Sequence, residues 1–446
     1  MQSEQKVVSK CLPRRSGDFA APLLHFFFRK MIDPPSYGTF IEFEVSVAKE
    51  LRLAVFSYFW NVHRFSGLRV PQRRSEEARK KKVLRSGRWV FAILIIILLL
   101  YRVIFLFVGF RQMRDFSHER IALLINLCLS VHGFASAVAL FVWTRRDLLK
   151  DFLREVSTTT AHKTISIGSV VSTGRNKALF TAVVLLSFLS EVFHLLGTAL
   201  DGRAIKGSPR DTPFQGPLFF ARELYPLELL LAFYSLAVSL TAIALFYLMT
   251  SLMFAEFKQF NKELKLAASN HRLLDEEVFC SFCDRHFDLL HLVRRVNAHV
   301  GVFVTTSVVS GLFIHFLAIF IVTNLSESAS WLEVVTCGLW FFVGTGFALT
   351  PMRKASALIS EAHESAQILV FEKSLGQNLK AECRPTTDFY THRMTDRVLN
   401  GDYYVRILRA FNLTSSLTSV IYFGAFLGGM VLNAFWLKVV HKDSDV

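Results

Sequence analysis

The chain has 446 residues, of which 52% are hydrophobic, and it carries 44 Phe and a formal net charge of +15. A positive charge this large would indicate a nucleic-acid-binding protein if it lay on a soluble domain. Here the basic residues flank long apolar runs, which indicates contact with lipid. The composition therefore favours a membrane bundle over soluble domains or a nucleic-acid-binding protein.

The first 88 residues are expected to lie in the cytoplasm. Residues 1–35 are polar and interrupted by prolines, so poor order is expected there, and no signal peptide is recognisable in the first 30. From Phe40 to Leu68 an amphipathic pattern predicts a helix on the cytoplasmic face of the membrane that leads into the first span.

A dense basic cluster, from Arg73 to Arg88, runs directly into the apolar stretch Trp89–Gly109. That stretch has about the ~20 residues that a helix needs to cross a bilayer. Cations beside a first span are retained in the cytoplasm, so the N-terminus is predicted to be inside.

Six further apolar windows follow, and together they predict an all-α, polytopic domain of seven transmembrane helices over residues 89–440. No proline lies in their interiors, and Pro226 and Pro351 mark edges. The spans are expected near residues 89–109, 121–143, 178–200, 226–253, 300–322, 332–349 and 417–440.

Charge placement supports this orientation, because about four fifths of the 51 Lys and Arg residues fall on the predicted inner side. The tail 441–446 is then extracellular. Asn324, in an Asn-Leu-Ser sequon between spans five and six, is a candidate glycosylation site, whereas the sequon at Asn412 lies on the predicted inner side.

The six cysteines lie in spans or on the cytosolic side, so no disulfide framework is expected.

Two cytoplasmic segments, 254–299 and 352–414, keep helical spacing beyond spans four and six. Spans four to six are therefore expected to continue as long helices into the cytosol and to pack against one another there.

Polar side chains in otherwise apolar spans are candidates for a ligand pocket, because ionisable groups at membrane depth are costly and usually face a cavity or a partner. The alternative is a structural ion pair, such as Arg102 with Glu191 or Glu228. The candidates are Glu191, His194, Glu228, Tyr234, His315 and Trp340.

Enzymatic activity and a bound cofactor are not expected. Glu191-x-x-His194 occurs once where a di-iron bundle needs the motif twice, and span seven has no histidine, unlike seven-span zinc hydrolases. Cys280 and Cys283, followed by His286 and His291, could bind zinc, but packing of small apolar side chains within a helix is the preferred interpretation.

Span seven is rich in glycine, with Gly424, Gly428 and Gly429 in YFGAFLGGMVLNAF. Such glycines allow close helix contact or a bend, and an apolar constriction beside them is a candidate gate that works by dewetting. Packing alone is the alternative. The candidate pore and gate residues are Gly428, Val431, Leu432, Asn433 and Phe435.

The chain resembles the arthropod gustatory receptors, within the insect chemoreceptor superfamily that includes odorant receptors. Phe59 to Val70, FWNVHRFSGLRV, is similar to the lead-in before that family's first span, and Phe411 to Phe435, FNLTSSLTSVIYFGAFLGGMVLNAF, is similar to its closing helix. The family's Thr-Tyr and Gln-Phe pairs are absent, since Gly428 and its neighbours replace the first and Ala434-Phe435 the second. The resemblance thus identifies a divergent member.

This resemblance implies a homo- or hetero-tetrameric, ligand-gated, nonselective cation channel of the plasma membrane. A tastant or odorant would bind among the outer halves of spans two to six, and span seven would line the pore. Two alternatives stay open: a G-protein-coupled receptor, which charge placement and missing signatures disfavour, and an orphan membrane scaffold without a pore.

Overall fold

The computed structural model describes residues 78–112, 118–161, 225–324, 331–371, 406–407, 411–412 and 414–444, with single positions at 181, 185, 188, 189, 192, 392 and 396. The predicted lead-in helix at Phe40–Leu68, almost all of the third predicted span, and both Glu191 and His194 lie outside these residues.

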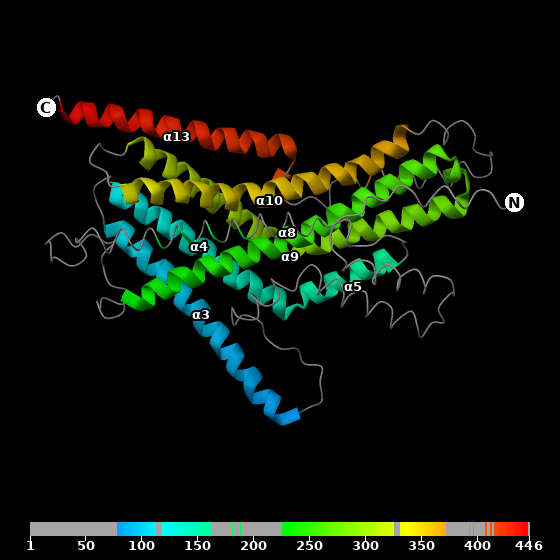
Figure 1. The fold of residues 1–446 in the computed structure, drawn as a ribbon, viewed down its shortest axis with the longest axis horizontal. Coiled ribbons are helices and arrows are strands. Elements are labelled where there is room, and N and C mark those ends of the chain that lie inside the picture. The colour runs from blue at the N-terminus through cyan, green and yellow to red at the C-terminus, as the bar shows by residue number, and fades with distance from the viewer. Residues whose placement is uncertain are drawn as a thin grey trace, which may run out of the picture.

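Helices account for nearly all of the described chain, which confirms the all-α class (Figure 1). A two-residue antiparallel pairing of β1 (Arg406–Ile407) with β2 (Phe411–Asn412) is added just before the last helix. The helices are α3 (Ala78–Gln112), α4 (His118–Arg145), α5 (Leu148–Ala161), α8 (Tyr225–Ser269), α9 (Glu276–Thr323), α10 (Trp331–Phe371) and α13 (Ser415–Ser444), with a 3₁₀ turn η3 (Arg272–Leu274).

Within the described residues, five helices are long and apolar enough to cross a membrane: α3, α4, α8, α9 and α10. A further apolar stretch, Ser416–Val431, lies in α13. The chain is thus a multi-pass membrane protein.

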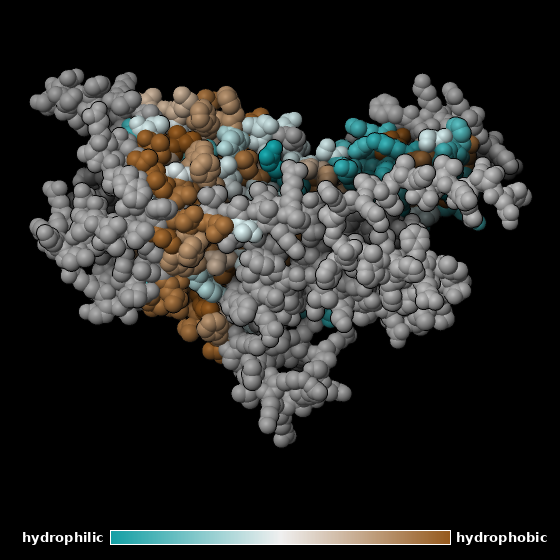
Figure 2. All heavy atoms as spheres, viewed as in Figure 1, coloured by the Kyte–Doolittle hydropathy of each residue, from teal (hydrophilic) through white to brown (hydrophobic). Residues whose placement is uncertain are grey.

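Helices α8, α9 and α10 contain 45, 48 and 41 residues. At 1.5 Å per residue each is about 60–70 Å long, roughly twice the hydrocarbon thickness of a bilayer. Figure 2 shows hydrophobic residues gathered on one side of the molecule and hydrophilic residues at the opposite end, near the α8–α9 connection. Part of each long helix therefore extends beyond the apolar zone.

The α8–α9 connection is short and capped. His271 adopts the left-handed conformation with φ of 56°, and Asp275 caps α9 by accepting a hydrogen bond from the backbone N–H of Glu277 at 3.1 Å. Glu276 and Glu277 place negative charge in the first turn of α9, where it stabilises the helix dipole.

Near this end the long helices add polar contacts to a core that still includes buried Phe260, Leu264 and Ala362. The Asn261 side chain donates to the backbone and carboxylate oxygens of Glu361 at 2.8 and 3.1 Å, and Ser365 donates to Asn261 Oδ1 at 2.7 Å. Arg285 pairs with Glu263. We call this part of α8–α10 the polar extension.

In the apolar zone α9 and α10 touch backbone to backbone. A Cβ added at Gly311 would lie 2.5 Å from the Ala348 amide nitrogen, and one at Gly344 would lie 2.6 Å from that of His315. Only glycine fits a contact this close. The pair therefore forms a tight crossing at the centre of the bundle.

Candidate ligand pocket

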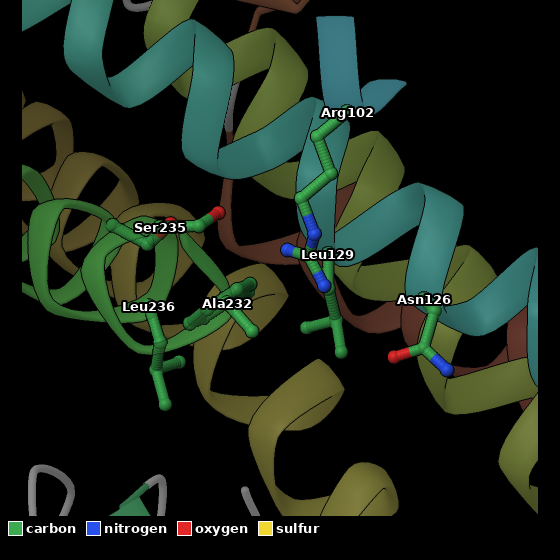
Figure 3. Close-up of a pocket in the computed structure, with 8 residues that line it drawn as sticks. Arg102, Asn126, Leu129, Ala232, Ser235 and Leu236 are labelled. Atoms are coloured by element: carbon green, nitrogen blue, oxygen red, sulfur yellow. The ribbon is translucent and has the colours of Figure 1, made fainter. Parts of the chain in front are cut away.

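A small pocket lies between α3, α4, α8 and α10 (Figure 3). Its cavity volume is about 20 Å³, which is enough for about one ordered water molecule. Polar and apolar side chains share its wall: Arg102, Asn126, Leu129, Ala232, Ser235, Leu236, Ser239 and Phe347.

The charged group in this wall is Arg102, which is 7% exposed. Its Nε donates to Glu228 Oε1 at 3.0 Å, so α3 is tied to the first turn of α8. A buried ion pair is costly unless its geometry is good, and at membrane depth such a pair marks either a site or a strong structural tie. The Arg102–Glu228 ion pair, which the sequence suggested as a structural alternative to ligand binding, is therefore present, directly beside the pocket.

The α8 side of the pocket is one helix face. Ala232, Ser235, Leu236 and Ser239 are spaced by three, four and seven residues, which brings them onto a single stripe. Asn126 and Leu129, three residues apart, do the same on α4. Both hydroxyls and the amide therefore face the same space as the Arg102 guanidinium.

Gly133 lets α4 approach α8 at this point. A Cβ built there would lie 1.7 Å from Ser235 Oγ and 2.9 Å from Ser235 Cβ. Because real Cβ atoms do not approach this closely, the absent side chain is what allows Ser235 to occupy its place in the pocket wall.

The aromatic side of the pocket depends on Pro351, which lies at the edge of the predicted sixth span and inside the continuous helix α10. Proline has no N–H to donate to the carbonyl four residues earlier, which belongs to Phe347. Ser307 of α9 donates to that carbonyl at 3.0 Å instead. A neighbouring helix thus supplies the missing donor, so α10 continues through the proline.

The same hydroxyl connects to His132 of α4, which is completely buried. Since the Ser307 proton is used on Phe347, the 3.1 Å contact with His132 requires Nε2–H of the histidine as donor. The His132 ring also stacks on the Phe347 ring with centroids 4.2 Å apart. Three helices therefore position the one aromatic residue in the pocket wall.

The other candidate ligand residues in the described chain are placed differently. His315 is buried on the opposite side of α10, where it contacts Thr345 at 2.9 Å and packs against the rings of Phe341 and Tyr422. Trp340 is buried in the core, and Tyr234 is half-buried beside the pocket residue Ser235. The wall residues Asn126, Ser235, Ser239 and Phe347 were not singled out from the sequence.

The candidate gate residues lie on α13, and the structure separates them. Cβ atoms added at Gly428 and Gly429 would each come within 3.1 Å of α9, from Phe316 and Ile319 respectively, so these two glycines face the bundle. Val431 is 68% exposed, and Gly424 has open space around it. The side chains of Leu432, Asn433 and Phe435 lie outside the described residues.

An apolar stripe runs along the exposed side of α13. We call it the α13 face, and it comprises Val420, Phe423, Phe426, Leu427, Met430 and Val431, between 43% and 68% exposed. In a membrane such a face meets lipid or another helix.

The Cys280–His291 segment lies within α9. Cys283 is buried in α9, in the part that precedes the predicted span at 300–322, and burial raises the pKa of its thiol to about 12. His286 is buried against the rings of Phe257 and Phe260, and no group of three or more metal-ligating side chains lies together among the described residues.

Asn324, the candidate glycosylation residue, is half-buried at the C-terminal cap of α9.

These features define a helical membrane protein with a polar pocket inside its bundle, and solved structures share its architecture. The structure of the insect olfactory receptor OR5 from Machilis hrabei matches with a TM-score of 0.64 at 12% identity, covering 86% of this chain and 98% of that one. The same receptor in complex with eugenol gives 0.63 at 12% identity, covering 87% and 98%. The chain therefore has the insect olfactory receptor fold.

The chain belongs to a family described as Caenorhabditis protein of unknown function, DUF267, which matches residues 55–426. No curated protein matches it.

Proposed function

We propose that the protein is a chemosensory receptor that acts as a ligand-gated, nonselective cation channel in the plasma membrane. The observation that carries the proposal is the Arg102–Glu228 pair beside an open pocket, inside a bundle with the insect olfactory receptor fold. A chain that needed only packing would gain little from a charged pair next to empty space.

In this proposal the ligand binds in the Arg102 pocket. Arg102, Asn126 and Ser235 all come from the halves of their predicted spans that end outside, so a compound would reach them from the outer surface. Glu228 acts by holding Arg102. Glu191, His194 and Tyr234 stay candidates for the same region, whereas His315 and Trp340 would act through the packing of α9 and α10.

The pore would be lined by α13 in a homo- or hetero-tetramer. The α13 face is apolar and uncovered in the single chain, so copies that meet around an axis would bury it. Val431 is the described gate candidate on that face, and Leu432, Asn433 and Phe435 stay candidates by their positions. Gly428 instead allows α13 to seat on α9.

A G-protein-coupled receptor would need an external N-terminus, against the distribution of basic residues. Epitope tags at both ends of the full chain test the topology: we expect an N-terminal tag to be stained only after permeabilisation and a C-terminal tag on intact cells. Surface staining of the N-terminal tag would contradict the proposed orientation.

Expression in oocytes with a panel of tastants, read as membrane current, tests the channel. Val431→Cys on the α13 face should let thiol reagents block the ligand-evoked current. Thr418→Cys is the matched control, since Thr418 is buried on the same helix and should stay insensitive. Equal sensitivity of both variants, or of neither in a responding channel, would exclude α13 as the pore lining.

A further inference from the structure

Basic residues gather where α3 enters the membrane. Between Ala78 and Arg88 more than half of the positions are Lys or Arg, and none is Asp or Glu. These positions form the first turns of a continuous helix that runs on through the first span. The cations therefore stand at a fixed place relative to the bilayer. They are Arg79, Lys80, Lys81, Lys82, Arg85 and Arg88.

Trp89 marks the point where α3 meets residues 145–151, which we call the α4–α5 corner. Its ring packs edge-on against the ring of Phe141, with centroids 5.0 Å apart. The guanidinium carbon of Arg145 lies 5.9 Å from the centroid of the Trp89 ring. Tryptophan is typical of the membrane–water interface. The corner and the first turns of α3 therefore lie at headgroup level on the same side of the membrane.

The α4–α5 corner adds two exposed arginines, Arg145 and Arg146. Neither forms an ion pair within the described part of the chain. Asp151, one of the two carboxylates of the corner, pairs with Arg295 of α9 at 3.0 Å. Asp147 is the other carboxylate, and one negative charge cannot balance both arginines and the cations of α3. The junction thus carries a surplus of positive charge.

Two of the α3 cations share the helix face that meets the corner. Lys82 and Arg85 stand seven and four positions before Trp89, which places them on the same face of α3. Like charges that converge on one place repel one another unless an anion lies between them. The planar fork of an arginine matches the oxygens of a phosphate group. The junction is therefore suited to a phosphate-bearing anion.

The apolar surface beside these cations favours a lipid over a soluble anion. Only 28% of the first span is buried, and in Figure 1 the first turns of α3 diverge from the other described helices. A single phospholipid can meet the cations with its headgroup and this surface with its acyl chains. The exposed apolar residues that follow Trp89, between 45% and 64% exposed, are Val90, Phe91, Ile93, Leu94 and Ile97.

We propose that the junction of α3 with the α4–α5 corner binds an anionic phospholipid. Arg145 and Arg146 hold its phosphate together with the cations of α3, and its acyl chains lie along the exposed side of α3. The predicted orientation assigns this lipid to the inner leaflet, where anionic phospholipids concentrate. The inference goes beyond the proposed function and requires neither a pore nor a bound tastant.

The test uses the purified full-length protein in detergent micelles and three probes: dioctanoyl phosphatidylserine, dioctanoyl phosphatidylcholine, and glycerophosphoserine, which has the serine headgroup without acyl chains. Apparent affinity is taken from the concentration dependence of the unfolding temperature, because a ligand that binds only the folded state raises it. Phosphatidylserine should bind at least about tenfold more tightly than either other probe, since one lacks net charge and the other lacks chains. Added salt should weaken its binding.

Two variants remove cations from the two sides of the site. Arg145→Gln with Arg146→Gln, at exposed positions of the corner, should weaken binding of phosphatidylserine roughly tenfold to thirtyfold. Lys82→Gln with Arg85→Gln makes the same change of charge on α3 and should act in the same direction. The second variant keeps the test decisive if the loss of Arg145 from the Trp89 ring disturbs folding.

The matched control is Lys262→Gln with Arg272→Gln, which removes two exposed cations from α8 and the α8–α9 connection and should keep the wild-type affinity. Equal affinities for phosphatidylserine and phosphatidylcholine, or unchanged binding of phosphatidylserine in both site variants, would overturn the proposal. Glycerophosphoserine binding as tight as that of phosphatidylserine would overturn it in favour of a soluble anion. A loss of the same size in the control variant would show that net charge, and not this junction, attracts the lipid.

Discussion

At the scale of single residues, the polar contacts around the pocket compensate for one another. Pro351 removes a backbone donor from α10, Ser307 replaces it, and His132 then donates to Ser307. Each group is buried in the apolar zone, where an unsatisfied polar atom costs several kcal/mol. Phe347 is positioned by this set of contacts, so its place in the pocket wall depends on residues from three helices.

Ser307→Ala should lower the free energy of unfolding by about 1–3 kcal/mol, because it leaves the Phe347 carbonyl and His132 without their partner. Pro351→Ala gives position 351 a backbone N–H that can donate to the Phe347 carbonyl. Ser307→Ala should therefore cost less stability in the Pro351→Ala background than in the wild type. A double-mutant cycle on thermal unfolding measures this coupling. Additive effects would contradict the explanation.

Gly133→Ala should narrow the pocket, because the new Cβ would occupy the position of Ser235 Oγ. We expect weaker binding of whichever compound the wild type binds, with the folded protein retained. Gly346→Ala is the matched control, since a Cβ there meets nothing within 4 Å. Equal affinities of the two variants would show that Gly133 does not shape the pocket.

The residues of the pocket could be predicted only in part. Arg102 and Glu228 stand out in the sequence because charge is rare in an apolar run, and their pairing was one of two alternatives considered. Asn126, Ser235, Ser239 and Phe347 carry no such signal, because small polar and aromatic residues are common in transmembrane helices. Which of them face a common space depends on how α3, α4, α8 and α10 pack.

At the scale of elements, α9 and α10 cross with their backbones in close contact. Gly311 and Gly344 bring the two backbones together, with the Ser307–Phe347 bond on one side and the His315–Thr345 contact on the other. His315 also packs on Tyr422 of α13. The crossing therefore lies between the pocket and the proposed pore helix.

Gly311→Ala should destabilise the protein by several kcal/mol, because its Cβ would meet the backbone of α10 at 2.5 Å and backbone cannot move aside as a side chain can. Gly338→Ala, in α10 with open space around it, should be neutral or stabilising by up to about 1 kcal/mol through helix propensity. The midpoints of thermal unfolding of the two variants measure this difference. Similar midpoints would show that α9 and α10 can move apart at their crossing without loss of stability.

Helix positions follow from local apolar runs, which is why α3, α4, α8, α9, α10 and α13 cover six of the seven predicted windows. The compensation of Pro351 was not predicted, because the donor that replaces its missing N–H, Ser307, comes from a different helix. Long helical spacing beyond the spans did indicate that α8, α9 and α10 continue.

At the scale of the whole molecule, an apolar zone and the polar extension divide the long helices between two environments. Figure 2 shows this division directly. The α13 face is the described surface that we propose further copies of the chain bury. The pocket lies on the other side of the α9–α10 pair from α13. A ligand and a pore would thus act at separate places that are joined through α9 and α10.

The measurement that tests the central claim most directly is the current through purified full-length protein in planar lipid bilayers. Compounds that raise its unfolding temperature are applied to one side. We predict that such a compound evokes a cation current. The variant that combines Arg102→Met with Glu228→Met, and so leaves no unpaired buried charge, should give a reduced response to the same concentration when reconstituted in equal amount. No current from wild-type protein at a concentration that saturates binding would contradict the account of a ligand-gated channel.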